Sequence, residues 1–244
     1  MTSSNPPAWH DTGTDQLLAE AAGAVAVVTF NNPGKHNALS SAMRAALPGL
    51  LEALQADSDI RVVIVTGAGD KAFASGADIS EFADRRTSPE ARAEYDRVSA
   101  ALGRSWHALG KPLIAMIRGF CLGGGLFTAL QADIRIVSDD SQFGVPAARL
   151  GVGPGFAGVT ALMDLVGPAW TSEILLSARR FSAAEALQMG LSTASCPRPA
   201  CGTTSWAWPR ASRRTRRSRS PRARRRSARP AGLPIAGTWG GSRR

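Results

Sequence analysis

The sequence predicts a layered α/β domain, and three observations support this prediction. Strand-like and helix-like stretches alternate along residues 24–191, which is typical of a sheet covered by helices. The apolar stretches at 62–65 and 112–117 show no polar alternation, as expected of strands buried on both faces. Three glycines, Gly123 to Gly125, separate the second stretch from an apolar helix.

The N-terminal elements follow in order. Residues 1–14 are rich in Ser, Pro and Thr and are expected to be flexible, so the domain is expected to span residues 15–191. Residues 24–30 form a strand by their β-branched content, and Asn-Asn-Pro-Gly marks a loop after it. Ser40 or Ser41 then caps a helix that runs to about Gln55, with a kink expected at Pro48.

The later elements repeat the alternation. Residues 82–109 are mostly helix with a polar, solvent-facing start, and Trp106 is expected to serve the core. Residues 132–137 form the next strand. Two helices over 156–166 and 168–177 are separated by Gly167-Pro168, and Ser182-Ala-Ala-Glu185 is a capping box that opens a helix to Met189.

The basic character of the chain is concentrated in its last 53 residues. Residues 192–244 hold 14 of the 29 basic residues and none of the 19 acidic ones, so residues 1–191 carry a net charge of −4. The composition changes abruptly after Leu191, from Leu/Ala-rich and mixed in charge to Arg, Ser, Pro and Trp. Such a tail has little apolar periodicity and is expected to be disordered.

We expect this tail to be the product of a reading-frame slip. Codons allowed for residues 192–199 read, one base out of frame, as Val-Asn-Arg-Val-Val-Pro-Ala-Ala, and codons allowed for residues 211–220 read as Ile-Ala-Ala-Asn-Ala-Pro-Leu-Thr-Leu. Resequencing the gene across the codons for Gly190 to Pro199 tests this, and a genuine basic tail that binds nucleic acid is the rival interpretation.

Composition also limits the class of protein. No apolar run reaches the roughly 18 residues of a membrane-spanning helix, and residues 1–23 lack the features of a secretion signal. The three cysteines show neither metal-ligand spacing nor a disulfide framework, which is typical of a reducing compartment. A cytoplasmic protein without a metal or other cofactor is therefore expected.

The glycine run places bare backbone at the start of a helix. Its N–H groups have no acceptor within the helix, and the helix dipole adds partial positive charge, so the turn suits an anion or an oxygen that becomes one. A tight turn with close packing is the alternative reading of a glycine run alone. A second stretch, AFASGADI at residues 72–79, also follows a buried strand, and Asp78 there is a plausible helix N-cap.

At this point the chain resembles the enoyl-CoA hydratase/isomerase (crotonase) superfamily. Four motifs carry the resemblance over residues 24–191: NNPGKHNALS at 31–40, AFASGADI, GFCLGGG at 119–125 and SQFGVP at 141–146. The resemblance implies a spiral of β-β-α repeats, assembled as trimers or hexamers, which acts on an acyl-CoA thioester in fatty acid metabolism. The tail would stand in place of the C-terminal helices of the family.

Two backbone donors are implied by the same motifs. In this superfamily two N–H groups form an oxyanion hole for the thioester oxygen, and by motif match they belong to Ala77 and Gly124. The resemblance also implies a set of residues beside the CoA part of the substrate. These are Lys35, His36, Ala38, Ser75, Asp78, Ile79 and Gly123.

The sequence departs from the family where protons are transferred. Hydratases of the family use two glutamates, and the matching positions hold Phe127 and Ala147, neither of which is a carboxylate. Six ionisable residues near the motifs are the replacements that the sequence offers, although a structural role is the plainer explanation for Asp78, Cys121 and Arg149. They are Asp78, Glu81, His107, Cys121, Arg149 and Asp164.

Three functions remain open at the level of sequence. The first is a lyase or isomerase of the family with altered chemistry, and the second is a non-catalytic acyl-CoA binding protein on the same fold. Turnover of crotonyl-CoA separates these two, because binding alone yields no product. The third is nucleic-acid binding through the arginine-rich tail, which a steep salt dependence would reveal. No membrane partner is expected.

Overall fold

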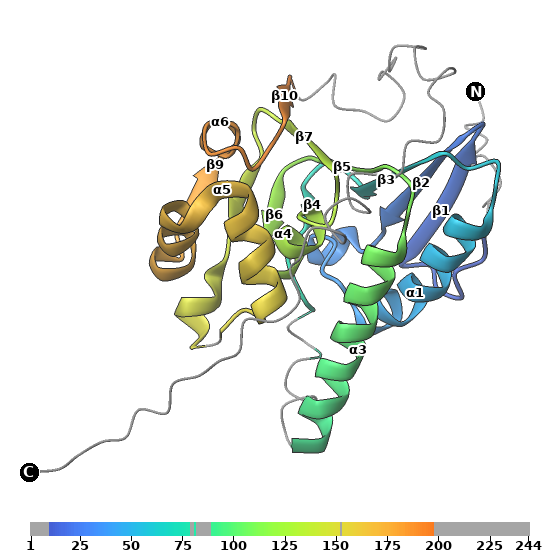
Figure 1. Ribbon diagram of the computed structural model, residues 1–244, viewed down its shortest axis with the longest axis horizontal. Helices are drawn as coiled ribbons and strands as arrows, with labels where there is room; N and C mark the ends of the chain where they lie inside the picture. The colour runs from blue at the N-terminus through green and yellow to red at the C-terminus, as the bar shows by residue number, and fades with distance from the viewer. Residues whose placement is uncertain (1–9, 79–80, 82–88, 152, 198–244) are drawn as a thin grey trace, which may run out of the picture.

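A computed structural model describes residues 10–78, 81, 89–151 and 153–197 of the 244-residue chain (Figure 1). Two sheets form its framework. The larger sheet has the strand order β1 (Leu17–Ala22), β2 (Val25–Phe30), β3 (Val62–Gly67), β5 (Leu113–Ile117), β7 (Ile134–Ser138) and β10 (Ala194–Cys196). The smaller sheet has the order β4 (Ala72–Ala74), β6 (Phe120–Leu122), β8 (Gln142–Gly144) and β9 (Arg180–Ser182).

The chain winds as the predicted spiral of β-β-α repeats. Strands β3 and β4, β5 and β6, and β7 and β8 are consecutive pairs that each give one strand to each sheet. Helix α3 (Pro89–Ala108) follows the first pair, α4 (Gly124–Ala129) the second, and η3 (Pro146–Leu150) with α5 (Phe156–Ser177) the third. Strands of successive turns pair in parallel in both sheets, which confirms the α/β fold class.

Several strands are absent from the sequence prediction. Strand β1 has no β-branched residue, yet it pairs antiparallel with β2 across a turn at Gly23, whose φ is +59°. Leu17 and Ala19 of β1 are buried, so pairing and burial override its weak intrinsic preference for a strand. The three-residue strands β4, β6, β8, β9 and β10 are too short to show a periodic pattern.

Helix α1 (Ser41–Ala56) begins where the sequence predicts. The Ser40 hydroxyl accepts a hydrogen bond from the Met43 N–H at 3.2 Å and caps the helix. Pro48 lies within the helix without ending it, and the apolar side packs into the core. Helix α3 lies against α1, and Trp106 of α3 is buried as predicted, whereas residues 82–88 of the predicted helix lie outside the described residues (Figure 1).

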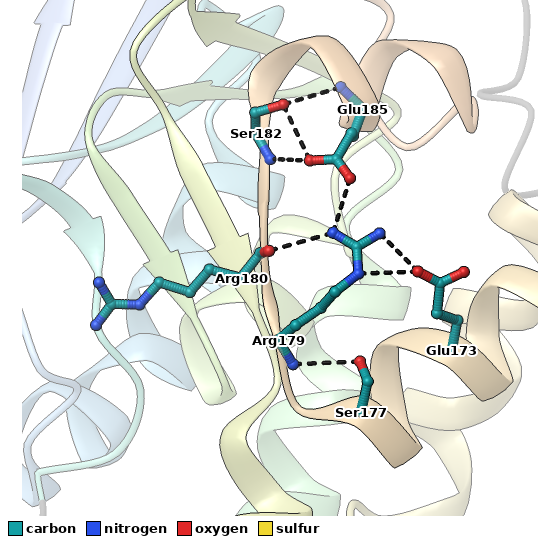
Figure 2. Close-up of polar contacts among 6 residues, drawn as sticks. All are labelled: Glu173, Ser177, Arg179, Arg180, Ser182 and Glu185. Carbon is teal, nitrogen blue, oxygen red and sulfur yellow. Dashed lines mark hydrogen bonds and ion pairs between the residues drawn. The ribbon is translucent and has the colours of Figure 1, made fainter.

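The predicted break before Pro168 is confirmed, because Gly167 inside α5 has φ 77° and ψ 170°. Beyond α5, an arginine links two helices (Figure 2). The Arg179 guanidinium contacts Glu173 of α5 at 2.6 Å and Glu185 of α6 (Ala183–Gln188) at 2.7 Å. Glu185 also accepts from the Ser182 N–H at 2.8 Å, which completes the predicted capping box. Both partners lower the pKa of Glu185, and the hydrogen bond from the Ser182 N–H has a larger effect than the one from Arg179.

The larger sheet continues past the predicted domain end at residue 191. Strand β10 pairs in parallel with β7, and the Thr193 N–H donates to the Arg135 carbonyl at 2.9 Å. Ser192 is buried, and its hydroxyl has no hydrogen-bond partner among the described residues. Most of the predicted tail, residues 198–244, lies outside the described residues, as do residues 1–9 of the predicted flexible N-terminus.

No helix in the described part of the chain is both long enough and apolar enough to span a membrane.

Candidate functional site

The two glycine-bearing turns adjoin each other at one edge of the smaller sheet. Strands β4 and β6 are parallel neighbours, so the chain leaves both at the same edge, at residues 75–78 and 123–125. A Cβ added to Gly125 would lie 2.1 Å from the Ala74 carbonyl oxygen, and one added to Gly124 would lie 3.4 Å from the Ala77 nitrogen. The two backbones therefore touch directly, which requires glycine in the second turn.

The N–H of Ala77 faces the second turn. Leu39 and Ala77 form a parallel bridge, in which the Leu39 N–H donates to Gly76 at 2.7 Å and the Asp78 N–H donates to Leu39 at 3.2 Å. In a parallel bridge the central residue directs its own N–H away from the partner strand. The Ala77 nitrogen is also the atom nearest to a Cβ added at Gly124, so the second turn lies close to this N–H group.

The N–H of Gly124 lies beside it. Gly124 is the first residue of α4, so its N–H has no acceptor within the helix. No hydrogen bond to an acceptor in the described residues engages this N–H or that of Ala77. The site thus holds two backbone N–H groups on adjoining turns, and their joint binding of one oxygen atom stays a prediction.

Local backbone geometry rather than the helix dipole sets up this pair. Helix α4 has six residues, so few peptide dipoles add up, and the dipole contribution expected from the sequence is correspondingly small. Gly123 has φ 49° and ψ −120°, and Gly76 has φ 115°. Both conformations favour glycine and allow the sharp turns that bring the donors together.

Apolar side chains occupy the two positions that the motif match assigned to the glutamates of the family. Phe127 of α4 and Ala147 of η3 are partly buried and pack against the hydrophobic core. The Phe127 ring lies against α5, since a Cβ added to Gly158 would come within 2.8 Å of its Cδ1 atom. Neither side chain can donate or accept a proton.

Of the six replacement acids and bases, the structure places Asp78 beside Ala77 in the turn. Its carboxylate is 7% exposed and lies 2.8 Å from the Lys35 ammonium group. Cys121 is fully buried, and burial raises the pKa of its thiol, so it stays protonated. Glu81 accepts from the Ser41 N–H at 2.9 Å at the start of α1. The other three, His107, Arg149 and Asp164, are exposed side chains on α3, η3 and α5.

Most residues predicted to lie beside CoA gather around the first turn. The Ser75 N–H donates to the His36 carbonyl at 3.0 Å, and the Ser75 hydroxyl donates to the Lys35 carbonyl at 3.2 Å. Ala38 is buried next to Leu39, and Gly123 opens the second turn. Ile79 lies outside the described residues. Contact with CoA stays a prediction for all of them.

Sequence reasoning missed three residues of this neighbourhood. The His36 and Phe120 rings pack edge to face, with 6.0 Å between their centroids. The Arg180 guanidinium lies 5.1 Å from the centroid of the Phe120 ring. Phe120 lies inside the quoted glycine motif, whereas Arg180 is brought in by β9 and had no signal. The third is Asn37, a buried side chain within the first motif.

No group of three or more His, Cys, Asp or Glu side chains that could hold a metal ion occurs in the described ranges. The absence of a cofactor stays a prediction.

The spiral fold and its paired turns define a crotonase-type α/β protein. The family model "Enoyl-CoA hydratase/isomerase" matches residues 20–208. Short-chain-enoyl-CoA hydratase of Clostridium acetobutylicum is 40% identical over 177 residues, 72% of this chain and 67% of that protein. Crotonyl-CoA hydratase of Syntrophomonas wolfei is 36% identical over the same shares. An enoyl-CoA hydratase/carnithine racemase from Magnetospirillum magneticum has a similar structure, with a TM-score of 0.74 and 38% identity over 77% of this chain and 70% of that one.

This chain belongs to the enoyl-CoA hydratase/isomerase family. The family resemblance read from the four motifs is therefore confirmed, and the enzyme class that it implies is a lyase or isomerase acting on acyl-CoA.

Proposed function

We propose that this chain binds an acyl-CoA thioester with the thioester oxygen between the N–H groups of Ala77 and Gly124. The observation that carries the proposal is a pair of backbone donors at adjoining turns that no acceptor in the described residues engages. Hydration or double-bond isomerisation makes the thioester oxygen enolate-like, and donors held in place bind it better as its charge grows. Loss of one such donor costs roughly 10²–10³ in rate in comparable sites.

We further propose that its chemistry differs from ordinary hydration. Activation of water and protonation of carbon need an acid and a base, and Phe127 and Ala147 can serve as neither. Asp78 adjoins the donors, but its ion pair with Lys35 favours a structural role for this carboxylate. The chain is therefore nominally a hydratase or isomerase with altered activity.

Non-catalytic acyl-CoA binding is the second candidate. It is favoured by the Phe127 ring, which packs against Gly158 where a reacting carboxylate would be needed. Both candidates require the same oxygen-binding site, so product formation from a thioester distinguishes them.

Calorimetry on two matched ligands tests the proposed site. We expect crotonyl-CoA to bind about tenfold or more tightly than S-butyl-CoA, a thioether without the carbonyl, because two hydrogen bonds of about 1 kcal/mol each are lost. In Gly124→Pro, which removes one donor at a helix position that tolerates proline, this preference should shrink. Equal affinities in the wild-type protein would refute the proposal, and a urea titration checks that the variant folds.

Assembly as a homotrimer or hexamer and a cytoplasmic location are proposed from the family alone. Analytical ultracentrifugation tests the first, where a monomer contradicts it, and cell fractionation tests the second. Nucleic-acid binding through the tail is not favoured by any described residue.

A further inference from the structure

Asn37 joins three segments of the chain from a buried position. Its side chain is 1% exposed, and its Oδ1 atom accepts from the Asn32 N–H at 3.0 Å. Its Nδ2 group donates to the Ala68 carbonyl at 2.8 Å and to the Ala72 carbonyl at 2.7 Å. The Asn37 side-chain amide thus makes three hydrogen bonds, and each of them is to a backbone group.

The two carbonyl acceptors lie just before the first donor turn. Ala68 follows β3, and Ala72 begins β4, the strand that leads to Ala77. Packing here is tight, because a Cβ added to Gly67 would lie 2.7 Å from the Asn37 Nδ2 atom. The amide therefore fixes where β4 starts relative to the loop at residues 32–39.

The residues on either side of Asn37 hold the turn itself. His36 accepts from the Ser75 N–H at 3.0 Å, and Leu39 forms the bridge whose two hydrogen bonds flank Ala77. The direction of the Ala77 N–H thus depends on the position of this loop, whose central tie to the fold is Asn37.

The loop backbone needs such a tie. His36 and Asn37 are consecutive non-glycine residues in the left-handed region, with φ of 52° and 54°. This conformation is unfavourable for residues with a Cβ, although asparagine accepts it more readily than most. Three hydrogen bonds to a buried amide offset this cost and keep a single loop conformation.

We propose that Asn37 is a positioning residue that aims the Ala77 N–H at the thioester oxygen without touching the substrate. The proposal rests on the proposed function, in which Ala77 is one of two donors. It predicts a defect confined to recognition of the carbonyl oxygen.

The test measures the preference for crotonyl-CoA over S-butyl-CoA in Asn37→Gly. Glycine keeps the left-handed backbone accessible and removes the three side-chain hydrogen bonds. We expect affinity for the thioether within about twofold of the wild type and a thioester preference reduced about fivefold or more, the size of one or two lost hydrogen bonds. Asn31→Ala is the matched control, since Asn31 lies at the start of the same loop and donates to Asp15 at 2.7 Å, away from the turn.

The outcomes separate the two proposals. A wild-type protein without a thioester preference overturns both. A wild-type preference that survives in Asn37→Gly overturns the role of Asn37 alone. An equal loss of affinity for both ligands also overturns that role, because it marks a defect of the whole fold. If Asn37→Gly does not fold, Asn37→Asp keeps the Oδ1 acceptor and loses the two donors, and the same ratio decides.

Discussion

Replacing Gly125 by alanine is expected to lower the free energy of unfolding by about 3 kcal/mol or more, near the upper end for an overpacked site. The added Cβ would lie 2.1 Å from the Ala74 oxygen and 2.8 Å from the Ala74 Cβ, so the end of β4 and the start of α4 would have to separate. Gly125 is buried, and its closest neighbour is backbone rather than a flexible side chain that could move aside.

Urea unfolding followed by circular dichroism measures this effect. Gly103→Ala in α3 is the matched control, because nothing lies within 4 Å of a Cβ added there and alanine favours a helix interior. The control should be as stable as the wild type or more stable by about 0.5–1 kcal/mol. Equal midpoints for Gly125→Ala and the wild type would show that the turns do not touch as described.

Hydration of crotonyl-CoA is expected to be very slow in the wild-type protein. A positioned acid or base contributes roughly 10²–10⁴ each, so the absence of both predicts a loss of about 10⁴ or more. Relative to an ordinary turnover of about 10 per second, this leaves roughly 10⁻³ per second or less. We expect Phe127→Glu combined with Ala147→Glu to raise the rate by about 10² or more, because the two carboxyl groups supply an acid and a base. A Glu side chain is shorter than the Phe127 side chain, so it fits in the same space.

Phe127→Gln combined with Ala147→Gln supplies the control, with the same side-chain shape and no proton-transferring group. The loss of absorbance of the conjugated thioester follows the reaction in all variants. A wild-type turnover near 10 per second would contradict the account and require a base that the described residues do not reveal.

The motifs predicted the adjoining turns because sharp turns and close backbone contacts require glycine, which the sequence shows directly. Glycine at 76, 123 and 125 marks sharp turns and close approaches, and the structure places them together through the pairing of β4 with β6. The two strands are three residues long and carry no periodicity, so the alternation of elements predicted only the α/β class, and the spiral arrangement came from the resemblance.

The contacts that hold the turns could not be predicted. Asn37 looks in sequence like one more turn-forming residue, and only tertiary structure shows its carbonyl partners 31 and 35 residues away. Arg180 contacts Phe120 from a strand 60 positions later in the chain, and no local sequence pattern predicts such a contact.

The end of the described chain bears on the reading-frame hypothesis. Strand β10 forms from Ala, Ser and Cys, and the Ser192 hydroxyl is buried without a partner among the described residues, which costs about 1–3 kcal/mol. The shifted reading places valine at this position, which has no hydroxyl to leave unpaired. The slip stays a prediction that resequencing decides.

Infrared spectroscopy of bound crotonyl-CoA, labelled with carbon-13 at the thioester carbonyl, tests the central claim most directly. Two hydrogen bonds to the oxygen weaken the carbonyl bond, so the isotope-edited band should move to a lower frequency than in water, and Gly124→Pro should recover part of this shift. A band at or above its frequency in water, with the ligand bound at saturation, would show that Ala77 and Gly124 do not hold the oxygen.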